Sequence, residues 1–115
     1  MNGESNGGID VSPDELDEFV ANGAVVLDVR EEGEWVAGHL AGARHVPLAE
    51  LPDHVDDLPS TTIVCVCRSG ARSRRAALFL TERGLAARNL AGGLLGWAEG
   101  GGEMVTSEGG PGVVA

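Results

Sequence analysis

Residues 62–75 read Thr62-Ile-Val-Cys-Val-Cys67-Arg-Ser-Gly-Ala-Arg72-Ser-Arg-Arg75, an apolar run followed by a tight turn and the start of a helix. Residues 63–66 are all apolar, as in a parallel strand that is covered on both faces, and Cys67 ends this strand. In open α/β sheets, ligands bind beyond the carboxyl ends of the strands. The sequence therefore predicts an α/β fold with a reactive thiol at the edge of its sheet.

The loop after this strand is suited to stabilise a negatively charged sulfur. Gly70 tolerates unusual backbone angles, so residues 68–71 can curl around the Cys67 side chain. The following helix presents unpaired N–H groups and the positive end of its dipole, and Arg68 and Arg72 add full charges. Such surroundings lower a cysteine pKa from about 8.5 to roughly 3.5–7.5. We therefore predict that Cys67 is mostly thiolate near neutral pH and acts as a nucleophile.

Four segments resemble the motifs of rhodanese-type sulfurtransferases, in the order of that family, and the resemblance covers about residues 9–100. They are Leu27-Asp-Val-Arg30, Gly38-His-Leu-Ala-Gly-Ala43, Cys67-Arg-Ser-Gly-Ala-Arg72-Ser73 and Asn89-Leu-Ala-Gly-Gly93. The resemblance implies a rhodanese-like three-layer fold, with a short parallel sheet and helices on both faces. It also implies a persulfide cycle, in which Cys67 takes a sulfane sulfur from a donor and passes it to cyanide or a thiol.

The resemblance also implies which residues surround the substrate. Cys67 is the expected catalytic residue, and the expected substrate-binding residues are Arg68, Ser69, Gly70, Ala71, Arg72 and Ser73. Asp28 and Arg30 end another predicted strand near the same edge, where they either support the site or form a structural ion pair. Arg68 beside the nucleophile favours a dianionic donor such as thiosulfate. 3-Mercaptopyruvate, glutathione persulfide and a cysteine desulfurase remain open as donors.

Two other function classes stay open. Phosphatases and arsenate reductases of related architecture have five residues between the cysteine and the arginine, whereas four residues separate Cys67 from Arg72 here. A non-catalytic rhodanese-like binding module is the other alternative, although such modules typically lack the cysteine. The length of this loop and the presence of Cys67 favour a thiosulfate sulfurtransferase-type enzyme.

No cofactor or metal is expected. His39, His45 and His54 have neither zinc-finger nor H-E-x-x-H spacing. Glu34 and His39 match family positions, and His39 is expected to be a hydrogen-bonded structural residue. Cys65 lies inside the apolar run, so we expect a small core residue that forms no disulfide with its neighbour Cys67.

Composition limits the partners. The formal net charge of −10 argues against nucleic acid and anionic membrane surfaces. Most acidic residues precede position 58, whereas four of the eight basic residues are Arg68, Arg72, Arg74 and Arg75. Of these, Arg74 and Arg75 lie beyond the loop and are expected to face solvent and to attract an anionic donor or an acidic acceptor protein. No signal peptide or membrane-spanning run is recognised, so a cytoplasmic location is expected.

The chain is short enough for one domain. Residues 1–8 are polar and glycine-rich and are expected to be a flexible arm. Residues 9–100 are expected to form the rhodanese domain. Residues 101–115 are rich in Gly and carry a few charges, so they are expected to be a flexible tail.

Overall fold

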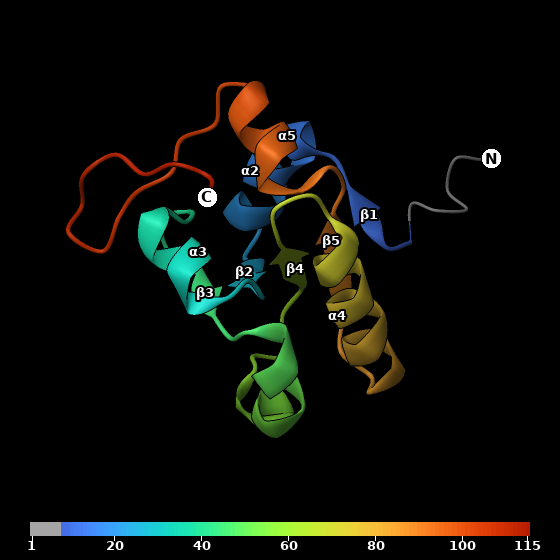
Figure 1. Cartoon of the computed structure of the whole chain (residues 1–115). Helices are drawn as coiled ribbons and strands as arrows, with labels where there is room; N and C mark the ends of the chain where they lie inside the picture. Colours follow the sequence, from blue (N-terminus) through green and yellow to red (C-terminus); the bar gives the residue numbers. More distant parts are fainter. Residues whose placement is uncertain (1–7) are drawn as a thin grey trace.

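The computed structural model describes residues 8–115 and shows a parallel sheet at the centre of the molecule (Figure 1). Five strands occur in the order β1-β5-β4-β2-β3 across the described part of the chain, and every neighbouring pair is parallel. The strands are β1 (Asp10–Val11), β2 (Val25–Asp28), β3 (Arg44–His45), β4 (Ile63–Val66) and β5 (Ala87–Leu90). The predicted α/β class with a short parallel sheet is therefore confirmed.

Helices cover both faces of the sheet, as expected for three layers. The helices are α2 (Pro13–Ala21), α3 (Glu32–Ala37), the 3-10 helix η1 (Leu48–Asp57), α4 (Ala71–Glu82) and α5 (Gly93–Glu99). On one face, α2 and α5 pack Leu16 and Leu94 against the sheet. On the other face, η1 and α4 pack Leu51 and Leu80 against it. Each face therefore has its own apolar core.

Strand β4 lies between these two cores and determines the direction of the Cys67 side chain. All four of its residues are fully buried. Successive strand residues point to opposite faces, so Val64 and Val66 join the core under α2 and α5. Ile63, Cys65 and Cys67 join the core under α4 and η1. The Cys67 thiol consequently lies on the face of the sheet that α4 covers.

Residues 12–15 fix the start of α2. The Glu15 side chain accepts a hydrogen bond from the Ser12 backbone N–H at 2.9 Å, Ser12 and Glu15 form a capping box, and Pro13 occupies the first turn. The helix ends before Gly23, which has a φ of 98°. This short turn leads directly into β2, the strand that lies beside β4.

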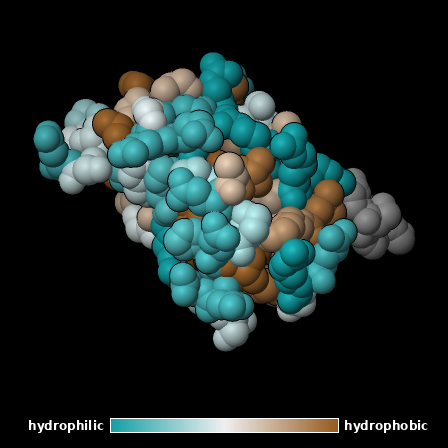
Figure 2. Space-filling view, turned by 60° about the horizontal axis from the view of Figure 1, so that its bottom comes forward, coloured by the Kyte–Doolittle hydropathy of each residue, from teal (hydrophilic) through white to brown (hydrophobic). Residues whose placement is uncertain are grey.

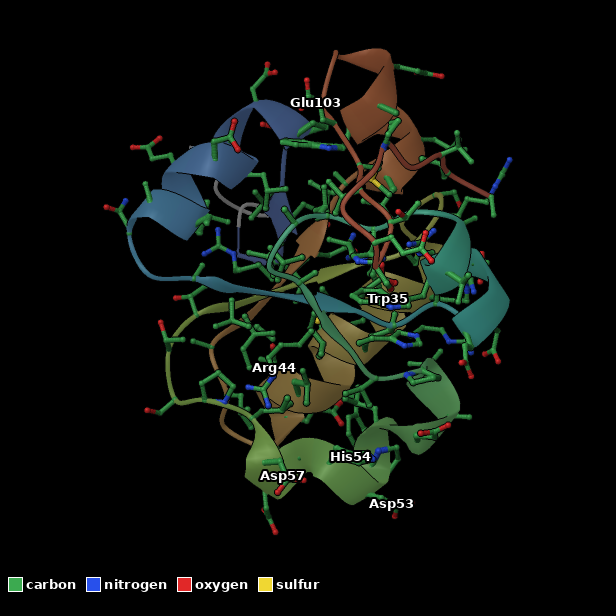
Figure 3. All side chains as sticks on the ribbon, turned by 90° about the vertical axis from the view of Figure 1, so that its left-hand side faces the viewer. Trp35, Arg44, Asp53, His54, Asp57 and Glu103 are labelled. Atoms are coloured by element: carbon green, nitrogen blue, oxygen red, sulfur yellow. The ribbon has the colours of Figure 1, made fainter. Side chains whose placement is uncertain are left out.

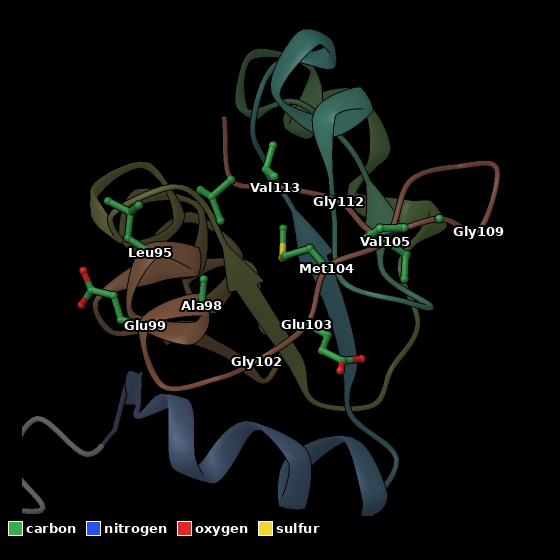
Figure 4. A pocket seen from close by; sticks show the side chains of 13 residues that line it. Leu95, Ala98, Glu99, Gly102, Glu103, Met104, Val105, Gly109, Gly112 and Val113 are labelled. Carbon is green, nitrogen blue, oxygen red and sulfur yellow. The ribbon is translucent and has the colours of Figure 1, made fainter.

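Residues 101–115, expected to be a flexible tail, make hydrogen bonds to the residues at the end of α3. The backbone N–H of His39 donates to the Val105 carbonyl at 2.9 Å, and the reverse bond measures 2.8 Å. The Val113 N–H donates to the carbonyl of Ala37 at 3.0 Å. Met104 is buried in the core under α5, and Figure 4 shows its side chain among those that line a pocket beside the C-terminal segment. Glycine-rich composition indicated mobility, but pairing with a distant segment is not visible in local composition.

The expected N-terminal arm, residues 1–8, falls almost wholly outside the described residues.

The face shown in Figure 2 is largely hydrophilic with small hydrophobic areas. Among residues 8–115, no helix combines the length and the apolar character needed to cross a membrane.

Candidate active site

The loop after β4 turns at Gly70, which directly precedes α4. Gly70 has a φ of 106°, a left-handed conformation that glycine adopts without steric cost, so the predicted role of this residue in the turn is confirmed. Its N–H donates to the Cys67 sulfur at 3.1 Å. Its carbonyl accepts the N–H of Arg74 at 3.1 Å and so joins the loop to the helix.

The Cys67 sulfur is surrounded by hydrogen-bond donors. Besides Gly70, the backbone N–H and the side-chain hydroxyl of Ser73 both lie 3.3 Å from it. Burial on its own raises the pKa of Cys67, but the hydroxyl and N–H of Ser73 and the N–H groups of Gly70 and Ser69 outweigh it. The net pKa is lowered from the ordinary thiol value. The predicted lowering of the Cys67 pKa is therefore confirmed in direction, and hydrogen-bond donors close to the sulfur cause most of this lowering.

Arg72 pairs with a carboxylate from another element. Its two terminal nitrogens donate to Glu34 of α3 at 2.8 and 2.9 Å, a bidentate ion pair. The hydrogen bonds from Arg72 hold the pKa of Glu34 at about 2, against an ordinary value of 4.5. Glu34 also accepts the N–H of Glu31 at 3.0 Å, which fixes the start of α3. The pair thus ties α3 to the start of α4, beside the sulfur.

The remaining loop residues are on the outside. Ser69, Ala71 and Arg68 are exposed, and the Arg68 Nε donates to the backbone oxygen of Ala115 at 2.9 Å. Arg68 therefore reaches the C-terminal segment, and among residues 8–115 its side chain makes no hydrogen bond to the sulfur. Of the six loop residues, Ser69, Gly70 and Ser73 direct hydrogen-bond donors at the Cys67 sulfur. The role of all six as substrate ligands stays a prediction.

The basic residues beyond the loop are exposed, as expected. Arg74 makes an ion pair with Asp10 at 3.0 Å, so part of its charge is compensated within the domain. Arg75 is exposed as well. The proposed attraction of anions by this cluster thus depends less on Arg74 than the sequence indicated.

Asp28 and Arg30 form a fully buried ion pair. The Arg30 Nη2 lies 2.8 Å from Asp28 and also donates to the Gly38 carbonyl at 2.7 Å. These bonds join the end of β2 to the residue after α3. The ion-pair alternative raised by the sequence is present, and any further support of the site stays a prediction.

The environment of His39 is that of a structural residue, as predicted. Its Nδ1 lies 2.9 Å from the Trp35 carbonyl, which can only accept, so this nitrogen donates. Its ring stacks on the Trp35 ring with centroids 3.6 Å apart. Trp35 can be followed in Figure 3, where it points from α3 toward the middle of the molecule.

The start of α5 is hydrogen-bonded to the loop that contains Cys67. The N–H groups of Leu94 and Leu95 donate to the carbonyls of Cys67 and Arg68 at 2.8 and 3.0 Å. Gly93 has a φ of 65°, and a Cβ at this position would collide with the Arg68 carbonyl. Sequence reasoning did not assign Gly93 to the site, although the Asn89–Gly93 motif contained the signal.

We expect Gly93→Ala to displace the loop because it combines a strained backbone with a steric clash. The strain alone costs about 1–3 kcal/mol. The alkylation rate of Cys67 should change, and the midpoint of chemical denaturation should fall. Gly84→Ala is the matched control, since Gly84 has a φ of 89° but no atom lies within 4 Å of the position that the alanine methyl group would take. Equal effects of both variants on Cys67 alkylation would contradict the proposed contact.

Asn89 is another residue of the site that sequence reasoning did not single out. It is buried, and its Oδ1 lies 2.6 Å from the Ser73 hydroxyl. Its Nδ2 donates to Asp10 at 3.1 Å.

In residues 8–115, no group of three or more His, Cys, Asp or Glu side chains is arranged to hold a metal.

Comparison with known proteins agrees with this geometry. The family model of the rhodanese-like domain matches residues 12–100. A protein named sulfurtransferase from Allochromatium vinosum is 33% identical over 87 residues, which cover 74% of this chain and 81% of that protein. The thiosulfate sulfurtransferase GlpE of Ectopseudomonas mendocina is 37% identical over 76 residues, covering 64% and 69%. A rhodanese-related protein from Thermoplasma volcanium superposes with a TM-score of 0.80 at 31% identity, covering 84% and 97%. The chain therefore belongs to the rhodanese-like domain family.

Proposed function

We propose that this protein is a sulfurtransferase that carries a sulfane sulfur on Cys67, with an anionic donor such as thiosulfate. The observation that supports this most is the Cys67 sulfur, which accepts the N–H groups of Gly70 and Ser73 at 3.1 and 3.3 Å and lies 3.3 Å from the Ser73 hydroxyl at the start of α4. Such a site stabilises negative charge on sulfur. The names of the Allochromatium and Ectopseudomonas relatives support the same class of reaction.

The proposed cycle has two displacement steps. The Cys67 thiolate attacks the outer sulfur of thiosulfate, a bond between the two sulfurs forms, and the S–S bond of thiosulfate breaks. Sulfite leaves with the electron pair, and Cys67 becomes a persulfide. Cyanide then attacks the terminal persulfide sulfur, and thiocyanate leaves while the Cys67 thiolate is restored. A thiol acceptor would take the sulfur in the same way and become a persulfide itself.

The loop accounts for the preference for an anion. The backbone N–H groups of residues 69–73 and the dipole of α4 favour negative charge at the sulfur. Arg68 is exposed at the rim, where it can exchange its bond to Ala115 for a bond to a donor. Arg72 is held in a defined position by Glu34, which also compensates part of its charge. We expect Arg68 and Arg72 to orient the donor around Cys67.

A panel of donors with cyanide as the acceptor tests this proposal. Thiosulfate, 3-mercaptopyruvate and glutathione persulfide are supplied in turn, and thiocyanate is measured beside the intact mass of the protein. We expect thiosulfate to give thiocyanate and to add the mass of one sulfur atom to Cys67. No sulfur adduct with any donor would contradict the sulfurtransferase. Hydrolysis of phosphate esters in its place would favour the phosphatase alternative.

A further inference from the structure

The Ser73 hydroxyl lies between two acceptors but has one proton. Its oxygen is 3.3 Å from the Cys67 sulfur and 2.6 Å from Asn89 Oδ1. All three residues are buried, so water does not easily supply a replacement bond. A hydroxyl has one O–H donor and two acceptor lone pairs, and it can donate fully to only one of the two neighbours.

The orientation of the Asn89 side chain is fixed from its other end. Asp10 and Asn89 are register partners on the adjacent strands β1 and β5. The Asn89 Nδ2 donates to Asp10 Oδ1 at 3.1 Å, and Arg74 donates to the same oxygen at 3.0 Å. A carboxylate can only accept, so a flipped amide would place two oxygens against each other. The amide oxygen of Asn89 therefore faces Ser73.

We propose that Asn89, held by Asp10, is a positioning residue that draws the Ser73 hydroxyl proton away from the Cys67 sulfur. This inference rests on the proposed role of Cys67 as the sulfur carrier. In the thiol state, Cys67 S–H donates to the Ser73 oxygen, and Ser73 donates to Asn89. When Cys67 is ionised, the Ser73 hydroxyl has two possible orientations. It can rotate and donate to the sulfur, which leaves Asn89 Oδ1 without a hydrogen bond. Alternatively it keeps its bond to Asn89, and the sulfur then accepts hydrogen bonds from the backbone N–H groups only.

In both orientations of the Ser73 hydroxyl, Asn89 makes ionisation of Cys67 less favourable, whereas the backbone N–H donors make it more favourable. This opposition has a chemical use, because the nucleophilicity of a thiolate falls as its pKa falls. A thiolate that is stabilised too strongly attacks a sulfur donor slowly. The backbone donors would keep Cys67 ionisable, while Asn89 would limit their effect and so keep the thiolate nucleophilic.

Several charged or titratable groups lie around this arrangement, and the test must leave them unchanged. They are Cys65 on β4, Arg68 in the loop, Arg72 on α4 with its partner Glu34 on α3, and Asp10 on β1 with its partner Arg74. Burial raises the pKa of Cys65 to about 12, so this thiol stays neutral in the relevant range. Asn89→Leu removes the acceptor, keeps a similar volume and alters no charge.

The experiment measures the rate of alkylation of Cys67 by iodoacetamide against pH in the full chain, with the modified residue identified by mass. We expect Asn89→Leu to raise the acid ionisation constant of Cys67 roughly two- to tenfold, as for one hydrogen bond gained by the thiolate. Asn89→Ala, which removes the acceptor without filling the space, should shift it in the same direction. Circular dichroism checks that each variant is folded.

Ser73→Ala provides the matched background. Because Asn89 acts through the Ser73 hydroxyl, Asn89→Leu should have no further effect on the Cys67 ionisation constant once that hydroxyl is absent. An unchanged or lowered constant in both folded Asn89 variants would overturn the proposal. So would a shift that persists in the Ser73→Ala background. The titration requires no sulfur donor, so its outcome is separate from that of the donor panel.

Discussion

Cys67→Ser is expected to reduce thiosulfate:cyanide sulfur transfer to below about one thousandth of the parent rate, as for loss of a covalent nucleophile. A serine hydroxyl is not ionised near neutral pH, and it cannot form the persulfide. Its oxygen would still receive the bonds from Gly70 and Ser73, so the loop should keep its shape. Thiocyanate formation and the intact mass after incubation with thiosulfate are the measurements. Activity in Cys67→Ser would contradict the assignment of the sulfur carrier.

Cys65→Ser is the matched control because Cys65 lies on the same face of β4, two residues before Cys67. It is fully buried, and its pKa of about 12 keeps it protonated. We expect most of the activity to remain. The buried hydroxyl should lower the free energy of unfolding by about 1–3 kcal/mol. Complete loss of transfer in a folded Cys65→Ser protein would show that both thiols take part.

The features that could be predicted from sequence are those that depend on local pattern. The continuous apolar run 63–66 predicted a strand buried on both faces, and its shortness together with the turn residues after it favoured a strand over a buried helix segment. Gly70 identified the turn, since its left-handed φ of 106° is one that other residues rarely adopt. The position of Cys67 at the end of β4 follows from these two facts.

The features that could not be predicted depend on partners far along the chain. Arg72 was expected to add charge near the sulfur and to bind substrate, but its partner Glu34, 38 residues away, was not predicted. Ser73 and Asn89 are 16 residues apart and meet because β5 lies beside β4. Val105 bonds to His39 although the composition of its segment indicated mobility. A local pattern shows that a polar group needs a partner, but the sheet order decides which partner it meets.

Arg72→Lys is expected to lower sulfur transfer by up to about a hundredfold, the loss that a small misplacement of a reacting group can cause. A lysine keeps the charge, but it cannot make the two parallel bonds that join Arg72 to both oxygens of Glu34. The start of α4 and the donor site beside Cys67 would then lose their fixed geometry. Steady-state kinetics with thiosulfate measure the effect. Unchanged kinetics would mean that Arg72 is only a surface residue of α4.

Glu34→Gln separates the pairing from the charge of Arg72. The pKa of Glu34 is lowered from 4.5 to about 2, chiefly by its hydrogen bonds with Arg72, so the ionised form stabilises the folded protein. This stabilisation is fully present above pH 4.5 and is lost as the pH falls toward 2. Denaturant midpoints of the parent should therefore fall more steeply over this range than those of Glu34→Gln. Parallel curves for the two proteins would show that the ion pair contributes no net stability. The lower rate of sulfur transfer in Arg72→Lys would then have to arise from the donor site alone.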